Sequence, residues 1–358
     1  MPLPFAIRLI LPALFFGYAV LGGLHALHGS QIPLPDKALL SGGLTAGFER
    51  LYKRDLPHHS LAFGLIGATR YTLLNEAQAG AIPGRDGWLV TAEETRVRPP
   101  SLTPILHSLL HVKARLAARG VDLVLLPLPA KIDLAASHSP SPALSQRAAT
   151  LHRDFLAALA AADIPAIDLR PALSGPPAAF FKTDTHWTPE GATLAARAVA
   201  ASGLIPGGEV RFTTLPLPSR GHSGDLIAFV TTPALAPAIG LPPEPLTATR
   251  LDMLGTSDIF AASATNIVLI GTSYSANPDW GFADALMLSL GRDVLNLAEP
   301  GLGPMLPMLR YLDSDALATD PPGMVIWEFP VRALTDPALL TSPTPDLVAQ
   351  TNAGGPHG

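Results

Sequence analysis

The sequence contains no cysteine, which excludes disulfide bonds, thiolate nucleophiles, zinc–thiolate sites and iron–sulfur clusters together. Charge is scarce as well, because Asp, Glu, Lys and Arg make up 15% of the chain, against about 25% in a typical soluble domain. Since 24 basic side chains face 29 acidic ones, there is no basic excess to neutralise phosphates, and we expect no nucleic-acid partner. Proline is abundant, at 38 residues, but it has no repeat period, which excludes collagen-like and low-complexity chains.

Apolar residues dominate the composition instead. They form 48% of the 358 residues, so the chain is not disordered and can bury a sizeable core. A chain of this length holds either two domains or one large α/β domain with additions.

The longest apolar stretch lies at the N-terminus, within residues 1–28. No Asp, Glu, Lys or Arg occurs between Arg8 and Asp36, and the stretch is long enough to span a bilayer as a helix. Because Arg8 is the charge that precedes it, we expect an inner-membrane anchor that leaves the bulk of the chain in the periplasm. A cleaved signal peptide has a similar layout and stays open as the alternative.

Strands and helices alternate along most of the remaining chain. Apolar runs predict strands at residues 88–90, 121–126, 164–169, 266–270, 293–297 and 324–328. Helical spacing of apolar residues predicts helices at residues 102–119, 143–162, 188–202, 279–290 and 304–312. The alternation implies parallel βαβ units, hence an α/β fold with a doubly wound parallel sheet and its functional residues at the C-terminal ends of strands.

The domain organisation follows from this pattern. The interval 203–262 is rich in proline and weakly patterned, and we expect it to be an insertion that walls the active site. We therefore divide the chain into four segments: a signal anchor or transmembrane helix (residues 1–28), a linker and packing segment (29–80), a main domain (81–335) and a flexible tail (336–358).

The first candidate for chemistry is the pair Asp184 and His186. In an extended segment, residues two apart face the same side, so the carboxylate can reach the imidazole. A carboxylate on Nδ1–H fixes the tautomer and leaves Nε2 free as a base. Trp187 could shield the pair from water, although a surface loop whose His186 bonds only to the backbone is an equally simple interpretation.

The second candidate follows the predicted strand 266–270. The strand runs directly into Gly271 and Thr272, so Ser273 would stand where an α/β sheet presents a nucleophile, and its N–H could face an oxyanion. The alternative is a serine that only caps a helix, and Ser275 is a weaker rival for the nucleophile.

Later strand ends supply further candidates. Backbone N–H groups of Gly301 or Gly303 could complete an oxyanion hole, although an ordinary loop has the same composition. Arg332 could orient a substrate, or it could form a structural ion pair with Glu328.

Together these motifs resemble the alginate O-acetyltransferase family of the AlgX and AlgJ type. The resemblance is carried by residues 184–187, Asp-Thr-His-Trp, followed far downstream by residues 271–275, Gly-Thr-Ser-Tyr-Ser. Supporting runs are residues 84–89 and 127–131, and Trp327-Glu328 with Arg332.

The resemblance implies an SGNH-hydrolase-like domain with a Ser273–His186–Asp184 triad. The acid–base pair precedes the serine, so the order of motifs is circularly permuted around the same sheet. Candidate substrate or oxyanion residues are then Thr272, Tyr274, Gly301, Arg332, Lys131 and Trp187.

The implied reaction moves an acetyl group through an acetyl-serine onto hydroxyls of an exopolysaccharide. Few residues follow Arg332, so there is no room for the carbohydrate-binding module of some relatives, and cellulose-like or acetan-like polymers remain open beside alginate. A multi-span membrane acyltransferase is the expected acetyl supplier.

Two other functions use the same features. An exported carbohydrate acetylesterase would use the triad with water as acceptor, and a polysaccharide-binding assembly protein would have an unreactive Ser273. We expect no cofactor and no metal, because the 11 histidines are scattered.

Overall fold

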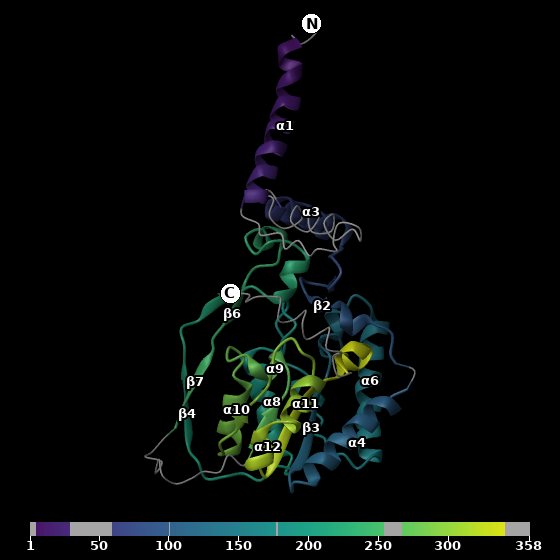
Figure 1. Ribbon diagram of the computed structural model, residues 1–358, viewed down its shortest axis with the longest axis vertical. Helices are drawn as coiled ribbons and strands as arrows, with labels where there is room; N and C mark the ends of the chain where they lie inside the picture. Colours follow the sequence, from purple (N-terminus) through teal and green to yellow (C-terminus); the bar gives the residue numbers. More distant parts are fainter. Residues whose placement is uncertain (1–4, 29–58, 100, 177, 254–266, 341–358) are drawn as a thin grey trace, which may run out of the picture.

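The computed structural model describes residues 5–28, 59–99, 101–176, 178–253 and 267–340 (Figure 1). The helices are α1 Phe5–His28, α3 His59–Leu74, α4 Thr103–Ala117, α5 Lys131–Leu134, α6 Pro142–Ala161, α7 Arg170–Leu173, α8 Pro189–Ala201, α9 Ser273–Ala276, α10 Phe282–Leu290, α11 Met305–Leu312 and α12 Asp315–Thr319. The strands are β1 Ala81–Pro83, β2 Leu89–Thr91, β3 Asp122–Leu128, β4 Phe212–Pro216, β5 Arg220–His222, β6 Glu244–Leu246, β7 Thr249–Met253, β8 Ile267–Ile270, β9 Leu295–Asn296 and β10 Met324–Pro330. Short 3-10 turns are η1 Ala92–Thr95, η2 Ala136–His138, η3 Asp225–Phe229, η4 Ala236–Ile239, η5 Val331–Thr335 and η6 Pro337–Leu339.

The central feature is a parallel sheet of four strands in the order β3-β10-β8-β9. Trp327 of β10 lies opposite Leu125 of β3 on one side and Ile270 of β8 on the other. The C-terminal ends of β8 and β10 therefore lie at the same edge of the sheet, where an α/β fold places its functional residues.

Helices cover both faces of this sheet. Leu269 of β8 belongs to a core with side chains of α8 and α10, whereas its neighbour Ile270 belongs to a second core with side chains of α4, α6 and α11. Successive strand residues point to opposite faces, so a strand that is covered on both sides must be apolar throughout, as β8 is. The α/β fold with a parallel sheet, predicted from the alternation of elements, is confirmed.

The predicted strand 164–169 is wrong. This segment makes a single bridge to β3, in which Leu125 donates to the Pro165 carbonyl and Ile167 donates to the Leu125 carbonyl. Pro165 has no N–H to continue a ladder, and helix α7 begins soon afterwards at Arg170.

Helix α3 lies in a segment that shows no helical period in the sequence. Its apolar residues are not gathered on one side, and Leu61, Leu65 and Leu73 are exposed. The helix packs against the chain after η3, where a Cβ on Gly67 would lie 2.0 Å from the Val230 carbonyl oxygen. The division into a linker and packing segment at residues 29–80 stays a prediction, and residues 29–58 lie outside the described part.

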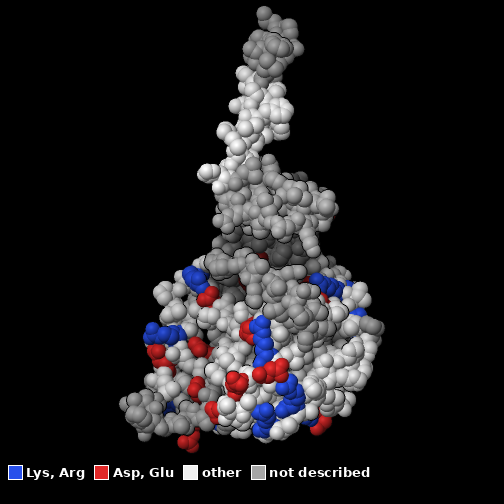
Figure 2. Space-filling view, viewed as in Figure 1, with Lys and Arg blue, Asp and Glu red and all other residues white. Residues whose placement is uncertain are grey.

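Helix α1 projects away from the rest of the molecule (Figure 1), and its described surface carries no Lys, Arg, Asp or Glu (Figure 2). Large apolar side chains such as Phe15 and Leu21 are exposed on it, at 66% and 69%. Within the described ranges, no helix meets the combined requirements of length and apolar character for crossing a membrane.

The interval 203–262 forms two antiparallel strand pairs, β4 with β7 and β5 with β6, and the turns η3 and η4. Its last residues, 254–262, lie outside the described part, as does Asn266, the predicted first residue of β8. The predicted tail at residues 336–358 contains the short turn η6, which Asp336 caps by accepting a hydrogen bond from the Ala338 N–H, and residues 341–358 lie outside the described part. Its flexibility stays a prediction.

Candidate active site

The turn after β8 places Ser273 at the edge of the sheet. Gly271 is required there, because a Cβ would lie 2.6 Å from Oε2 of Glu328. The Thr272 side chain accepts a hydrogen bond from the Tyr274 N–H and caps α9, which begins at Ser273. The first N–H groups of a helix have no acceptor within it, so the Ser273 N–H is available to a ligand.

Glu328 on β10 anchors this turn from inside the protein. It is fully buried and accepts hydrogen bonds from the Thr272 N–H at 2.7 Å, the Thr272 hydroxyl at 3.0 Å and the Ser275 hydroxyl at 3.2 Å. Burial raises the pKa of Glu328, while the Thr272 and Ser275 donors act in the opposite direction. The predicted alternative of a Glu328–Arg332 ion pair is wrong, because Arg332 pairs with Glu93.

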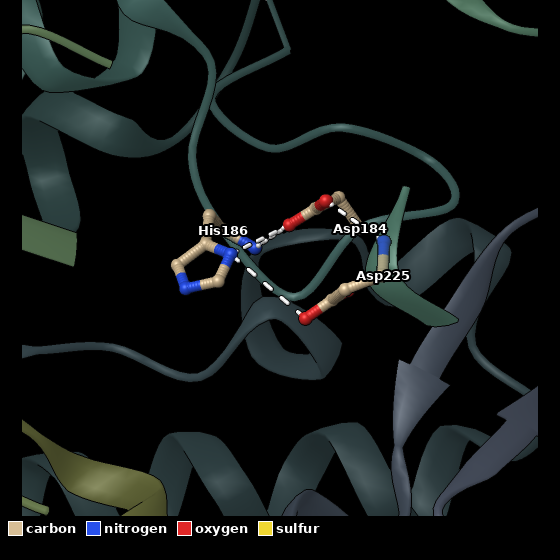
Figure 3. Close-up of side chains that lie close together, drawn as sticks. All are labelled: Asp184, His186 and Asp225. Atoms are coloured by element: carbon tan, nitrogen blue, oxygen red, sulfur yellow. Dashed lines mark hydrogen bonds and ion pairs between the residues drawn. The ribbon is translucent and has the colours of Figure 1, made fainter. Parts of the chain in front are cut away.

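The second segment of the site lies in a loop that folds back on itself. Phe180 and Trp187 form an antiparallel bridge, and residues 182–186 bend between them. Oδ1 of Asp184 accepts the His186 N–H at 2.8 Å and lies 2.6 Å from His186 Nδ1 (Figure 3). The predicted contact is therefore present, but a tight turn produces it rather than an extended segment.

His186 connects the two segments. Its Nε2 lies 2.7 Å from Ser273 Oγ, so the structure brings Ser273, His186 and Asp184 into one hydrogen-bonded chain. Because an ionised carboxylate only accepts, Nδ1 carries the proton, and Nε2 is left to accept the Ser273 hydroxyl proton. This is the tautomer that a general base requires.

Asp184 has a second imidazole partner that the sequence analysis missed. His222 of β5 donates from Nε2 to the other carboxylate oxygen at 2.8 Å, and the Asp225 N–H donates to the same oxygen at 3.0 Å. Burial opposes ionisation of Asp184, but the hydrogen bonds from His186 and His222 outweigh it and hold the pKa of this carboxyl well below its usual range. Asp184 is thus a buried, permanent anion with both oxygens engaged.

Asp225 also faces His186, with Oδ2 at 3.9 Å from Nδ1 (Figure 3). Burial and the negative charge of Asp184 raise its pKa. Ligand atoms of Asp184, His186 and Asp225 lie within 4.8 Å of one another, which a metal ion could in principle use. The 2.6 Å contact between Asp184 and His186 is a hydrogen bond in which Nδ1–H donates to the carboxylate.

Aromatic rings enclose His186, but not those that the sequence predicted. Trp280 stacks on the imidazole at 5.3 Å between ring centres, and Tyr274 lies against it at 4.9 Å. Trp187 is fully buried, donates its indole N–H to the Tyr274 carbonyl and contacts Phe282. Trp187 therefore supports the turn that carries Ser273 from behind, and Trp280 covers one face of the His186 ring.

Burial raises the pKa of Tyr274, so its phenol keeps its proton and donates to the Thr185 carbonyl at 2.8 Å. Like Thr272, whose polar groups bond to Glu328, Tyr274 joins parts of the site rather than presenting a group to substrate.

Lys131 does not occupy the substrate-contacting position that was predicted for it. It is 1% exposed, and its ammonium donates to the carbonyls of Leu89, Lys182 and Asp184 at 2.5, 2.8 and 2.8 Å. Burial lowers the pKa of Lys131 to about 8, while the charges of Glu94 and Asp184 oppose this shift. The side chain instead ties the loop that carries Asp184 to β2.

Ser273 and His186 face a cavity of about 520 Å³, hereafter the broad cavity, whereas Asp184 is buried behind them. Its lining includes Glu93, His186, Asp225, Phe229, Ser273 and Arg332. Asp225 and Phe229 belong to the interval 203–262, so the prediction that this insertion walls the site is confirmed. Arg332 lies over the Tyr274 ring at 5.7 Å and faces the cavity beside Ser273, and its predicted role in orienting substrate stays a prediction.

His222 offers a test of how Asp184 is positioned. In His222→Phe the ring can still pack against Phe181 and Trp280, but Asp184 loses one donor. We expect kcat for acyl transfer to fall about tenfold or more, because a hydrogen bond to a charged group contributes about 1.5–3 kcal/mol. KM should change little, since His222 does not line the broad cavity.

His222→Gln is the matched control, because an amide can still donate to Asp184, and it should recover most of the lost rate. The comparison of the two variants separates positioning from packing, because Phe keeps the ring and Gln keeps the donor. A His222→Phe variant that keeps the wild-type kcat, beside a His222→Gln variant that loses it, would reduce His222 to a packing residue.

Comparisons with known proteins match the same part of the chain. A family model described as "SGNH hydrolase-like domain, acetyltransferase AlgX" matches residues 81–331. A protein of Pseudomonas fluorescens described as a probable alginate O-acetylase AlgJ is 37% identical over 334 residues, which cover 89% of this chain and 85% of that protein. The predicted resemblance is thereby confirmed.

Two solved structures share the fold. The O-acetyltransferase domain of Pseudomonas putida AlgJ superposes with a TM-score of 0.62 at 33% identity and covers 78% of this chain and 100% of that domain. AlgX of Pseudomonas aeruginosa superposes with a TM-score of 0.57 at 23% identity over 72% of this chain and 66% of its own, which bears on the fold alone.

Proposed function

Because this chain belongs to the AlgX family of SGNH hydrolase-like acetyltransferases, we propose that it transfers acetyl groups through an acetyl-serine at Ser273 onto hydroxyls of an alginate-like exopolysaccharide. The observation that carries the proposal is the 2.7 Å contact between Ser273 Oγ and His186 Nε2 at the wall of the broad cavity. The relatives are named as alginate O-acetylases, which supports an alginate-like acceptor for this chain.

The first half of the reaction forms the acetyl-serine. His186 Nε2 takes the Ser273 proton while Oγ attacks the acetyl carbon of a donor ester. The bond between the acetyl carbon and the donor oxygen then breaks, and His186 returns the proton to that leaving oxygen. Asp184, held ionised by its four hydrogen bonds, stabilises the imidazolium that exists between these two proton transfers.

The second half transfers the acetyl group to sugar. A sugar hydroxyl gives its proton to His186 Nε2, its oxygen bonds to the acetyl carbon, and Ser273 Oγ leaves and regains the proton. Water would release free acetate in the same step, so transfer requires that the sugar displace water from the broad cavity. The charged side chains Glu93, Asp225 and Arg332 in its lining can hydrogen-bond the hydroxyl and carboxylate groups of an acidic sugar.

The test measures how the acetyl group partitions between sugar and water. Purified protein receives para-nitrophenyl acetate with alginate oligosaccharide, and mass spectrometry of the sugar follows acetylation while acetate release is measured in parallel. We expect acetylated oligosaccharide in the wild type and none in Ser273→Ala, with oligosaccharide binding retained in both.

Each other outcome selects another function. Acetate release without acetylated sugar would assign the chain as an esterase. Sugar binding with no reaction of the wild type with any ester would leave a polysaccharide-binding assembly protein. A neutral gluco-oligosaccharide serves as the control for acceptor choice, and its equal acetylation would contradict an alginate-like specificity.

We also propose that the chain works in the periplasm, held at the inner membrane by the segment that contains α1, and receives acetyl groups from a multi-span membrane acyltransferase. The exposed apolar side chains of α1 and its projection from the body support contact with lipid (Figure 1). Cell fractionation with sequencing of the mature N-terminus tests this: a cytoplasmic protein would contradict export, and a new N-terminus after residue 28 would replace the anchor by a cleaved signal peptide.

A further inference from the structure

A second cavity opens on Ser273 beside the broad one. It measures about 120 Å³ and is hereafter the narrow cavity. Its lining includes Ser273, Gly301, Pro304, Pro330, Ala333 and Leu339. Glu93, Ser273 and Arg332 line both cavities, but His186 lines the broad cavity and is absent from the residues that line the narrow one.

The chemistry gives the two cavities different occupants. In each half of the reaction, an oxygen that leaves or attacks the acyl carbon exchanges a proton with His186 Nε2, so it must lie within hydrogen-bond reach of that atom. The donor's leaving oxygen and the sugar hydroxyl must therefore occupy the broad cavity in turn. The acyl substituent stays on Ser273 throughout and exchanges no proton, so it needs a place beside the serine and away from His186.

We propose that the narrow cavity is the acyl pocket, and that Ala333 and Leu339 set the length of the acyl group that Ser273 accepts. This assignment rests on the proposed acyl transfer. The acyl carbonyl carbon is bonded to Ser273 Oγ, and its alkyl part extends between Pro304, Pro330 and the two length-setting side chains.

The lining of each cavity suits its occupant. Glu93 and Arg332 line both cavities, so the difference lies in the other residues. Pro304, Pro330, Ala333 and Leu339 line the narrow cavity alone and offer an apolar surface to an alkyl group, whereas Arg96 and Asp225 line the broad cavity alone and can hydrogen-bond a sugar. Ala333 is 2% exposed and forms one wall of the pocket. Leu339 in η6 forms another wall and packs closely on the loop after β9, because a Cβ added to Gly303 would lie 3.1 Å from the Leu339 Cβ.

Backbone conformation keeps the pocket open at the loop after β9. Gly301 and Gly303 have φ values of 77° and 67°, which residues with a Cβ rarely adopt. No side chain therefore fills the space next to Ser273. The cavity of about 120 Å³ is smaller than one of about 150 Å³ that holds benzene, which suits it to a short acyl group.

The test uses para-nitrophenyl acetate, butyrate and hexanoate, whose cleavage reports formation of the acyl-serine without any sugar. The wild type should prefer acetate. Leu339→Ala removes a wall at a partly exposed position, and the hexanoate-to-acetate ratio of kcat/KM should rise about tenfold or more, as one methylene in an apolar pocket changes specificity by about 10- to 200-fold. Ala333→Leu should lower the butyrate-to-acetate ratio by a similar factor.

Phe229→Ala is the matched control in the broad cavity. It should alter acetyl transfer to alginate oligosaccharide but leave the chain-length ratios at their wild-type values. The assignment is overturned if Leu339→Ala leaves the ratios unchanged or if Phe229→Ala shifts them as much. Failure of the proposed function is distinguishable, because esters would still be cleaved with the expected chain-length profile while no sugar is acetylated.

Discussion

Ser273→Ala should lower the rate of acetyl transfer by about 10⁵-fold or more, since removal of a serine nucleophile from a triad costs about that much in kcat. The structure gives the reason, because the Ser273 hydroxyl meets the unprotonated Nε2 of His186 at 2.7 Å. Single-turnover measurement with para-nitrophenyl acetate, and mass spectrometry of the intact protein, should show no covalent acetyl group in the variant.

The fold should survive this change. The turn is held by Gly271, Thr272 and Glu328 rather than by the Ser273 side chain, so the unfolding temperature should stay close to that of the wild type. Ser275→Ala is the informative companion, because its hydroxyl bonds to Glu328 at 3.2 Å and is 2% exposed. That variant should still form the acetyl-serine; its failure, with a normal Ser273→Ala, would make Ser275 the nucleophile.

Asp184→Asn should lower kcat by about 10⁴-fold while leaving substrate binding intact. An amide can turn its NH₂ group toward His186, which would force the proton from Nδ1 to Nε2 and remove the acceptor for the Ser273 proton. The measurement is kcat and KM for ester cleavage, together with the pH–rate profile. A kcat within tenfold of the wild type, which corresponds to a difference in activation free energy of about 1.4 kcal/mol or less, would mean that Asp184 does not determine the tautomer of His186.

The same variant should also change how the unfolding temperature depends on pH. The pKa of Asp184 lies below its usual range in the folded protein, so its interactions stabilise the fold above its unfolded pKa of about 3.9 and lose this effect as the pH falls. Wild type and Asp184→Asn should therefore differ most in unfolding temperature near neutral pH and converge in acid. Asp168→Asn is the control, because that side chain is 45% exposed and an asparagine oxygen can still accept the Arg170 N–H, so its difference should be small at every pH.

The nucleophile turn could be predicted because its signals are local. An apolar run that ends in Gly271 and Thr272 specifies a buried strand followed by a tight turn, whatever surrounds it. Asp184 and His186 were found for a similar reason, since residues two apart meet in several backbone conformations. The predicted extended geometry was nevertheless wrong, because the bridge between Phe180 and Trp187 folds the segment into a loop.

His222 and Trp280 could not be found in this way. His222 lies in a proline-rich interval with weak periodicity. Its role as a hydrogen-bond donor to Asp184 depends on how close β5 lies to Asp184, which no local sequence pattern encodes. Trp280 was expected to lie in a helix, yet α10 begins at Phe282 and leaves the ring free to stack on His186. Lys131 illustrates the converse: a lysine is usually exposed, and only the three carbonyls around it explain its burial.

The sequence by itself determined the class of fold, the edge of the sheet that carries the serine, and the types of residue available for acyl transfer, because periodicity and short motifs act over a few residues. Tertiary structure decided how these residues meet. His186 and Ser273 are 87 residues apart, and packing of α8 and α10 on one face of the sheet brings them to 2.7 Å. The division of space around Ser273 into two cavities depends on the same long-range packing, since its walls come from segments that adjoin only after the chain has folded.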